Sequence, residues 1–356
     1  MSEILAPCGA MESLTAAVNA GADAVYLGEE YFSARKNADN FTAEQLCDAV
    51  RFCHYSGVKV YVTLNTLVFD REIPLLAKAI ENCAKADVDA FIVQDMGVAR
   101  LSRQIVPELP LHASTQMTVN SPEGAIMAKE LGFTRVVLGR ELSFAQIKAI
   151  TESCDIETEL FVHGALCVCI SGQCYMSSVL GGRSGNRGLC AQPCRLDFTS
   201  GDRHNVLSLK DLSLTEKLPE LAKAGITSFK IEGRMKRPEY VAGVVNACRV
   251  ALDGGTPDLI SLKNVFSRSG FTSGYFDDDF KNMQGVRTKD DVTSATSKVL
   301  SAMKQYYHKP FRRFPADITV NVKRGQPVCY KLSACGVSSS AVGDIPEKAV
   351  NRAVTA

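Results

Sequence analysis

The sequence alternates short apolar segments with amphipathic segments from residue 3 to about residue 254. Eight of the short segments have the character of buried strands, and nearly all are followed by a segment with helical periodicity. These strand segments lack strict polar and apolar alternation, which is typical of parallel strands buried on both faces. Eight such units over roughly 250 residues predict a closed (β/α)8 barrel of the TIM type. The expected strands are residues 3–7, 23–28, 58–68, 90–95, 109–119, 135–142, 157–167 and 228–234.

A doubly wound open sheet is the alternative α/β fold for such a pattern. It would normally carry a G-x-G-x-x-G turn between a strand and a helix. The sequence has no such unit, so the barrel is the preferred prediction.

The pattern is interrupted once, after the seventh expected strand. About 40 residues from Cys167 to Asn205 are rich in glycine, serine, arginine and cysteine and have no helical periodicity. Loops of this length in a compact domain are usually functional. Because this loop joins a strand to the next helix, it should lie at the carboxyl ends of the barrel strands, where TIM barrels carry their active sites.

The expected domain organisation follows from these patterns. Residues 1–255 should form the barrel, with the cysteine-rich segment at residues 167–194, and residues 256–289 should be a connector of short helix and turns. Residues 290–345 should form a small β domain, because Ile318 and Val320 alternate along one strand, Tyr330 and Leu332 alternate along the next, and Gly325 lies in the turn. Residues 346–356 resemble the start of another helix, so we expect the chain to be a shortened form of a longer protein.

Composition excludes several classes of protein. The chain has a formal net charge of +1 and 22% charged residues, which is an ordinary globular composition. No apolar run approaches the roughly 20 residues that span a bilayer, and the N-terminus lacks the features of a signal peptide. We therefore expect a cytoplasmic protein with no membrane partner, in a compartment where thiols stay reduced. Basic residues are dense near the cysteines and again at residues 234–237, and such groups can contact phosphates.

Five of the 13 cysteines lie within the 28 residues from Cys167 to Cys194. Cys167 and Cys174 are separated by six residues, and Cys190 and Cys194 by three. Four thiolates from one glycine-rich loop suit an iron–sulfur cluster or a structural zinc ion. Zinc knuckles usually have two-residue spacers, so the longer spacers favour the bulkier cluster, and unligated thiols are the third alternative. Cys169 is expected to be a packed neighbour and not a ligand.

The segment "ELFVHGALCVCISGQCYMS" resembles the signature of the collagenase-like peptidase family U32. The segments "RGLCAQPCR", "KIEGRMKRPEY" and "LAPCGAMESLTAAVNAGADAVYLG" also resemble this family, so the resemblance covers residues 3 to about 280. The β segment near the end resembles the start of the C-terminal region in the branch that hydroxylates ribosomal RNA. The positions that match the signature are Glu159, Phe161, Gly164, Cys167, Gly172, Cys174 and Ser177.

The resemblance implies a 4Fe–4S cluster held by Cys167, Cys174, Cys190 and Cys194. It also implies oxygen-independent hydroxylation of an RNA base, with a cytidine of 23S rRNA favoured over a tRNA uridine. In the RNA branches the hydroxyl donor route depends on prephenate, which is the implied co-substrate, and an electron donor is a further implied partner. All four cysteines are present, so the quinone-hydroxylating branch, in which ligands are exchanged, is disfavoured.

Proteolysis, the reaction in the family's name, is the alternative function. A cysteine peptidase needs a thiolate beside a histidine, and Cys167 and His163 are four residues apart. However, a cysteine bound to a cluster cannot also be a nucleophile, and the sequence has neither an H-E-x-x-H nor a G-x-S-x-G motif. A metal-stabilised RNA-binding module without catalysis is the third hypothesis.

Polar residues near the carboxyl ends of the expected strands are candidates for the active site. His112 and Gln116 should share one strand face, and Lys230, Glu232 and Arg234 alternate along another strand and should share a face. Cations at this position would suit a dianionic donor such as prephenate. The predicted catalytic residues are His163, His112 and Arg234, and the predicted substrate-binding residues are Gln116, Arg140, Lys230, Glu232, Arg183 and Arg187.

Overall fold

The computed structural model describes residues 2–35, 38–309, 311, 315–334 and 336–347, and it confirms the (β/α)8 barrel. Neighbouring barrel strands are parallel, and the eighth of them, β9, pairs with both β1 and β7, which closes the sheet. The barrel strands are β1 (Glu3–Pro7), β2 (Ala24–Gly28), β3 (Lys59–Leu64), β4 (Ala90–Val93), β5 (Leu111–Ala113), β6 (Arg135–Val137), β7 (Glu157–Ala165) and β9 (Ser228–Ile231).

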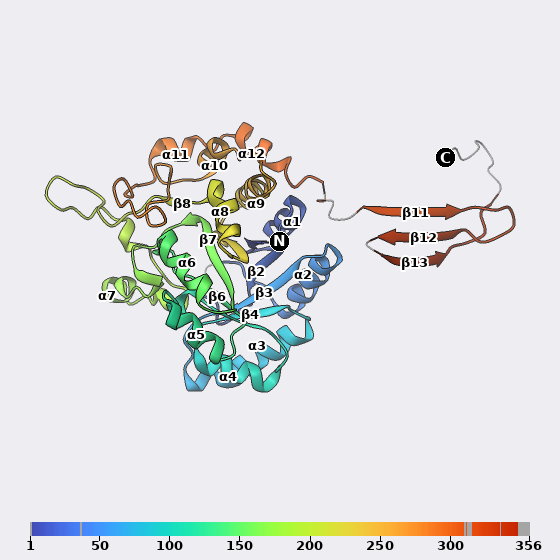
Figure 1. The fold of residues 1–356 in the computed structure, drawn as a ribbon, viewed down its shortest axis with the longest axis horizontal. Helices are drawn as coiled ribbons and strands as arrows, with labels where there is room; N and C mark the ends of the chain where they lie inside the picture. The colour runs from blue at the N-terminus through green and yellow to red at the C-terminus, as the bar shows by residue number, and fades with distance from the viewer. Residues whose placement is uncertain (1, 36–37, 310, 312–314, 335, 348–356) are drawn as a thin grey trace. The chain divides into compact units, whose positions relative to one another are not determined.

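Helices cover the outside of the barrel (Figure 1). The second helix begins with a capping box: Gln45 N donates to Thr42 Oγ1 at 3.3 Å, and Thr42 N donates to Gln45 Oε1 at 3.1 Å. The main helices are α1 (Met11–Ala20), α2 (Ala43–Tyr55), α3 (Ile73–Lys85), α4 (Met96–Ile105), α5 (Pro122–Glu130), α6 (Phe144–Ser153), α8 (Leu218–Lys223) and α9 (Pro238–Leu252).

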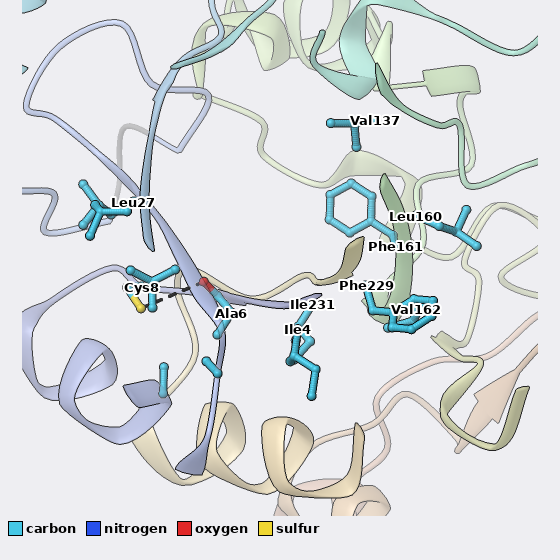
Figure 2. Close-up of a cluster of buried hydrophobic side chains, with 14 of the residues drawn as sticks. Ile4, Ala6, Cys8, Leu27, Val137, Leu160, Phe161, Val162, Phe229 and Ile231 are labelled. Atoms are coloured by element: carbon cyan, nitrogen blue, oxygen red, sulfur yellow. Dashed lines mark hydrogen bonds between the residues drawn. The ribbon is translucent and has the colours of Figure 1, made fainter. Parts of the chain in front are cut away.

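Two layers of apolar side chains stabilise the barrel. The larger layer lies between strands and helices, and Figure 2 shows part of it, including Ile4 of β1, Val162 of β7 and Phe229 of β9. Because alternate residues of a strand point to opposite faces, strands buried on both sides are apolar along their whole length. The smaller layer lies inside the barrel and consists of Leu5, Ala24, Tyr26, Tyr61, Ala90 and Ile92.

The loop between β7 and β9 contains short elements that the sequence does not predict. The helix α7 (Met176–Gly181) ends at Gly182, whose φ of 64° is a left-handed conformation that favours glycine. Six residues are too few for helical periodicity to stand out in a sequence. The loop also contains the 3-10 turns η3 (Ile170–Gly172), η4 (Gly185–Arg187) and η5 (Pro193–Arg195), and β8 (Asp211–Ser213), which pairs antiparallel with β7.

The region after the barrel departs from the expected boundaries. The helix α10 (Leu259–Val265) and the strand β10 (Phe271–Thr272) lie in the expected connector. However, α11 (Lys289–Thr293) and α12 (Ser297–Lys304) occupy the first part of the range 290–345, so a β domain beginning at residue 290 is wrong. The local signals for these helices are their N-caps, Thr288 and Thr296, whose side chains accept hydrogen bonds from backbone N–H groups.

Residues 1–311 form one compact unit and residues 312–356 form another. In the second unit, β11 (Ala316–Asn321), β12 (Cys329–Ala334) and β13 (Val337–Val342) form an antiparallel sheet. Ile318 pairs with Leu332 and Val320 with Tyr330, as the alternation predicts. The expected extension at residues 346–356 lies outside the described residues from position 348 onward. No helix in the described part of the chain is long and apolar enough to cross a membrane.

Candidate active site

Hydrogen bonds fix the cysteine loop to the carboxyl ends of the barrel strands. Ser171 donates to Glu141, which follows β6, through its backbone N–H at 3.0 Å and its hydroxyl at 2.6 Å. The side-chain amide of Gln173 donates to the backbone carbonyl of Gln116, which follows β5. The loop therefore covers the end of the barrel where the sequence analysis expects the active site.

Arg195 holds the two ends of the cysteine segment together. Its Nη2 donates to the Leu166 carbonyl at 2.6 Å, and its Nη1 donates to the Leu209 carbonyl. Leu166 precedes Cys167, and Arg195 follows Cys194. The Arg195 guanidinium therefore connects the backbone beside Cys167, the first predicted ligand, to the backbone beside Cys194, the last.

The four predicted ligands are free thiols in one loop. Burial raises the pKa of the Cys194 thiol, Arg195 acts in the opposite direction, and Cys167, Cys190 and Cys174 raise this pKa further. All three other cysteines therefore act electrostatically on Cys194.

Backbone donors lie beside two of these sulfurs. The N–H of Met176 is 3.4 Å from Cys174 Sγ, and the N–H of Gln192 is 3.3 Å from Cys190 Sγ. Donors of this kind stabilise thiolate ligands and tune the metal centre. Within the described residues, no group of three or more His, Cys, Asp or Glu side chains is arranged around one metal ion. The cluster and the zinc ion both stay predictions from the sequence.

Cys169 lies beside the predicted ligands. Burial raises the pKa of its thiol, and the neighbouring Cys167 and Cys174 add to the effect. The geometry alone does not distinguish Cys169 from the other four, so its exclusion from the ligand set stays a prediction.

Three arginines surround one carboxylate at the barrel mouth, and we call Arg35, Arg140 and Arg234 the arginine cluster. The Nη2 atoms of Arg35 and Arg140 bind the two oxygens of Glu232 at 3.1 Å and 2.8 Å. Burial opposes ionisation of Glu232, but the three arginines outweigh it and lower the pKa of this carboxyl to about 2. Arg35 also lies within electrostatic range of Cys190. Arg140 Nη1 also donates to the Ala165 carbonyl, two residues before Cys167, at 3.1 Å, so the arginine cluster lies at the same end of the barrel as the cysteine loop.

Arg234 is held by hydroxyl groups. Its Nη1 donates to Ser33 Oγ at 2.6 Å and to Thr63 Oγ1 at 3.1 Å, and no ion pair joins it to a carboxylate among the residues described. Burial lowers the pKa of Arg234 to about 10, and Arg35 acts in the same direction. The side chain stays protonated at neutral pH, so the arginine cluster holds two more positive charges than Glu232 neutralises.

Arg35 is a candidate that the sequence analysis does not include. It lies in the loop between β2 and α2, where no motif marks it. Its place in a loop after a barrel strand is the only local signal, because such loops carry the active sites of TIM barrels.

Lys230 belongs to a separate ion-pair network inside the barrel. Its Nζ lies 2.6 Å from Glu159 Oε1, while Arg135 lies 3.2 Å from Glu159 Oε2 and 2.7 Å from Glu3 Oε1. Burial opposes ionisation of Glu159, but Lys230 and Arg135 lower the pKa of its carboxyl. Lys230 is therefore neutralised by Glu159 and forms no ion pair with Glu232, its neighbour on the expected strand face.

His112 does not lie with the cysteines. Its ring packs edge-on against Tyr61 at 4.8 Å and lines a pocket with Lys59, Arg135 and Glu157. These last three residues are the first residues of β3, β6 and β7, so the pocket opens at the amino ends of the strands. The expectation that His112 faces the barrel mouth is wrong, because the strand register pairs His112 with Arg135, the first residue of β6, and so places it at the amino-end half of the barrel.

His163 packs away from the cysteines as well. Its Nδ1 lies 3.3 Å from Ser213 Oγ, and its ring contacts Phe271 at 4.9 Å and Tyr240 at 5.9 Å. An irregularity in the pairing of β7 with β9 falls between Phe161 and His163 and breaks the alternation of side chains there. His163 therefore faces β8, β10 and α9, and a catalytic role for it has no support in this placement.

Both histidines should make the protein sensitive to acid. Burial lowers the pKa of each imidazole to about 3, below the ordinary value of 6.5. The unfolded state then binds more protons between these values, so the free energy of unfolding should fall by about 2 kcal/mol per histidine from pH 7 to pH 5. Urea unfolding at several pH values measures this fall. The fall in the free energy of unfolding from pH 7 to pH 5 should be about 2 kcal/mol smaller in His163→Phe than in the control His308→Gln, which alters an exposed histidine. Equal falls in the two variants would contradict the prediction.

Gln116 and the two predicted RNA-binding arginines have defined partners. Gln116 lies in η2 (Thr115–Met117), beyond the end of β5, because Ser114 Oγ accepts from its N–H and turns the chain. It therefore shares no strand face with His112.

Arg187 binds Glu72 at 3.1 Å and 2.6 Å and so holds the cysteine loop instead of presenting a free cation. Arg183 is exposed and donates to the Leu189 carbonyl at 3.1 Å.

Comparison with known proteins supports the resemblance in the sequence. A 23S rRNA 5-hydroxycytidine synthase of Escherichia coli (strain K12) is 43% identical over 284 residues, which are 77% of this chain and 42% of the relative. The tRNA hydroxylation protein P1 of Bacillus subtilis (strain 168) is 39% identical, and the match covers 72% of this chain and 64% of the relative. A collagenase of Porphyromonas gingivalis (strain W83) is 36% identical, and the match covers 77% of this chain and 73% of the relative.

The chain thus spans less than half of the length of the E. coli relative and 64% of that from B. subtilis. Residues 9–284 match the sequence model of the family described as peptidase family U32. This range contains the barrel from α1 onward, the cysteine loop and the arginine cluster. The chain belongs to peptidase family U32.

Proposed function

We propose that the chain hydroxylates an RNA base in an iron–sulfur-dependent, oxygen-independent reaction, with a cytidine of 23S rRNA as the favoured base and a tRNA uridine as the alternative. The observation that carries the proposal is the placement of a loop with four free thiols over the barrel mouth, where the arginine cluster holds a surplus of positive charge. The names of the E. coli and B. subtilis relatives support RNA as the substrate. The higher identity to the E. coli relative supports rRNA.

The proposed cofactor is a 4Fe–4S cluster held by Cys167, Cys174, Cys190 and Cys194, and a bound cluster would supply one-electron redox chemistry. The backbone donors at Cys174 and Cys190 support thiolate ligands at these two positions. The cluster is preferred over zinc because the spacers between the cysteines are longer than those of zinc knuckles. Conversion of C–H to C–OH oxidises the base by two electrons. A hydroxyl group delivered at the oxidation level of water leaves these two electrons and the proton of the C–H bond to be removed. A partner that accepts the two electrons therefore belongs to the proposal, in place of the electron donor expected from the sequence.

The arginine cluster is the proposed binding site for the hydroxyl donor. Prephenate carries two carboxylates, and the arginine cluster has two positive charges beyond those that Glu232 neutralises. Glu232 orients Arg35 and Arg140, and the ring of Phe161, 3.9 Å from Arg140 Cζ, supports the plane of that guanidinium. Arg234 has only one of its terminal nitrogens engaged by Ser33 and Thr63 in the described contacts.

Expression of this chain in a strain that lacks the rRNA hydroxycytidine tests the function. Nucleosides from 23S rRNA and from tRNA are compared by mass spectrometry, after growth with and without oxygen. We expect hydroxycytidine in the rRNA under both conditions. Hydroxylated uridine in tRNA would identify the alternative base. Absence of both products from cells that contain folded, iron-loaded protein would contradict the proposal.

Proteolysis is the second candidate, because the P. gingivalis relative is named a collagenase. A cysteine peptidase would need His163 beside Cys167, but the ring of His163 contacts Ser213, Phe271 and Tyr240. Iron-free protein that cleaves denatured collagen, and loses this activity when its thiols are blocked, would favour proteolysis. Brown, iron-loaded protein without cleavage would favour hydroxylation.

A further inference from the structure

A second group of cations surrounds the ring of Phe266, outside the arginine cluster. Lys236 Nζ lies 2.8 Å from the ring centroid, and the Cζ atoms of Arg287 and Arg268 lie 4.4 Å and 5.3 Å from it. Lys236 comes from the loop between β9 and α9, and the two arginines come from the region after α10. These residues are distant in sequence, and the fold places their charges around one point.

Only one carboxylate accompanies these cations in the described contacts. Asp211 Oδ1 accepts from Arg268. Arg195, next to Cys194, also lies within electrostatic range of Asp211 and Arg268. Asp211 is therefore the one carboxylate hydrogen-bonded to these four cations in the described contacts, and Glu232 acts on Lys236 without an ion pair. Four cations with two carboxylates leave a surplus of positive charge that extends toward Cys194.

The electrostatics of Lys236 reflect this surplus. Burial lowers the pKa of Lys236 to about 7, and Arg268 and Arg287 act in the same direction against Asp211 and Glu232. Cations that repel one another in a partly buried group are stabilised by an incoming anion. The charges therefore indicate a binding site for an anion and not a self-neutralised ion-pair network.

We propose that Lys236, Arg268 and Arg287, continued by Arg195 toward the cysteines, bind the phosphodiester backbone of the RNA substrate, and we call these four residues the phosphate strip. The inference rests on RNA as the substrate in the proposed function. Arginine and lysine are the side chains that most often hold nucleic-acid phosphates. Because Arg195 adjoins Cys194, backbone bound along the strip would deliver a neighbouring base to the barrel mouth.

A chain of phosphates suits this strip better than one small anion does. One or two cations would satisfy a free phosphate ion, whereas the four cations of the strip, at residues 195, 236, 268 and 287, carry more charge than one phosphate balances. Several cations match the repeated charge of a nucleic-acid backbone and bind it by releasing counterions.

Salt-dependent RNA binding tests the strip. The affinity of anaerobically purified full-length chain for a single-stranded RNA oligonucleotide is measured by fluorescence anisotropy over a series of KCl concentrations. Each phosphate contact contributes about 0.7 to the slope of log affinity against log salt, so Lys236→Gln with Arg287→Gln should lower the slope by about 1.4. Arg287→Gln alone, at an exposed residue, should lower it by about 0.7.

The matched control is the double variant Lys78→Gln with Lys129→Gln, which removes the same charge from exposed positions on α3 and α5. Equal slopes in the strip variants and this control would overturn the proposal, and so would a wild-type chain that binds no RNA. Displacement of RNA by inorganic phosphate beyond the effect of KCl at equal ionic strength would instead identify a small-anion site and also overturn it. Strip-dependent RNA binding without any hydroxylated product would refute the proposed function and leave the strip standing.

Discussion

Cys190→Ser is expected to reduce the iron of the anaerobically purified protein to background and to remove the charge-transfer absorption of a cluster. Removing a group that is hydrogen-bonded to a metal ligand already lowers metal affinity or enzyme activity about 10- to 100-fold. Removing the ligand itself should therefore lower RNA hydroxylation at least about 100-fold. Cys190 is exposed, and its Sγ accepts from the Gln192 N–H. A serine oxygen can accept the same hydrogen bond, so the variant should fold.

Cys169→Ser is the matched control for this variant. It removes a thiol from the same loop, beside Cys167 and Cys174, but not from the predicted ligand set. The control should keep its iron and its absorption spectrum. Full iron in Cys190→Ser, together with iron loss in Cys169→Ser, would show that the ligand set is wrong.

Lys230→Met should lower the free energy of unfolding by about 3–5 kcal/mol, the usual cost of leaving a buried charge without its partner. Glu159 is fully buried, and Lys230 Nζ is 2.6 Å from its Oε1. Without Lys230, Arg135 alone would offset this carboxylate at 3.2 Å, while it also binds Glu3. Urea unfolding at neutral pH measures the loss.

Two further variants identify the cause of that loss. Lys148→Met alters an exposed lysine on α6, 3.7 Å from Glu152, and should change stability by less than about 1 kcal/mol. Lys230→Met combined with Glu159→Gln should be more stable than Lys230→Met alone, because the stranded charge is then absent. If Lys230→Met were as mild as Lys148→Met, the buried network would not contribute as we infer.

The barrel could be predicted because each of its strands and helices has a local pattern. Thr42 and Gln45, for example, mark the start of α2 within four residues, and both hydrogen bonds of a capping box are present. Boundaries set by side-chain hydrogen bonds were harder to predict. The fifth strand ends at Ala113, well before the expected residue 119, because Ser114 accepts a hydrogen bond from the backbone N–H of Gln116.

The active site could be predicted only in part. The four cysteines are marked by residue type and by nearness in the sequence, so they could be found without a structure. The ion pair of Arg35 with Glu232 joins residues 197 positions apart, and no local pattern indicates it. His112 and His163 are residue types common in catalysis, but the structure buries both away from the cysteines.

The sequence by itself determined the barrel, the position of the cysteine loop and the family, because periodicity and the cysteine motif are local properties of a chain. Only the tertiary structure decided which cations are neutralised. Glu159 neutralises Lys230 and Glu72 engages Arg187, whereas the arginine cluster and the phosphate strip each retain a surplus of positive charge. Neutralisation depends on the distance between charges, and folding sets that distance for residues far apart in the sequence.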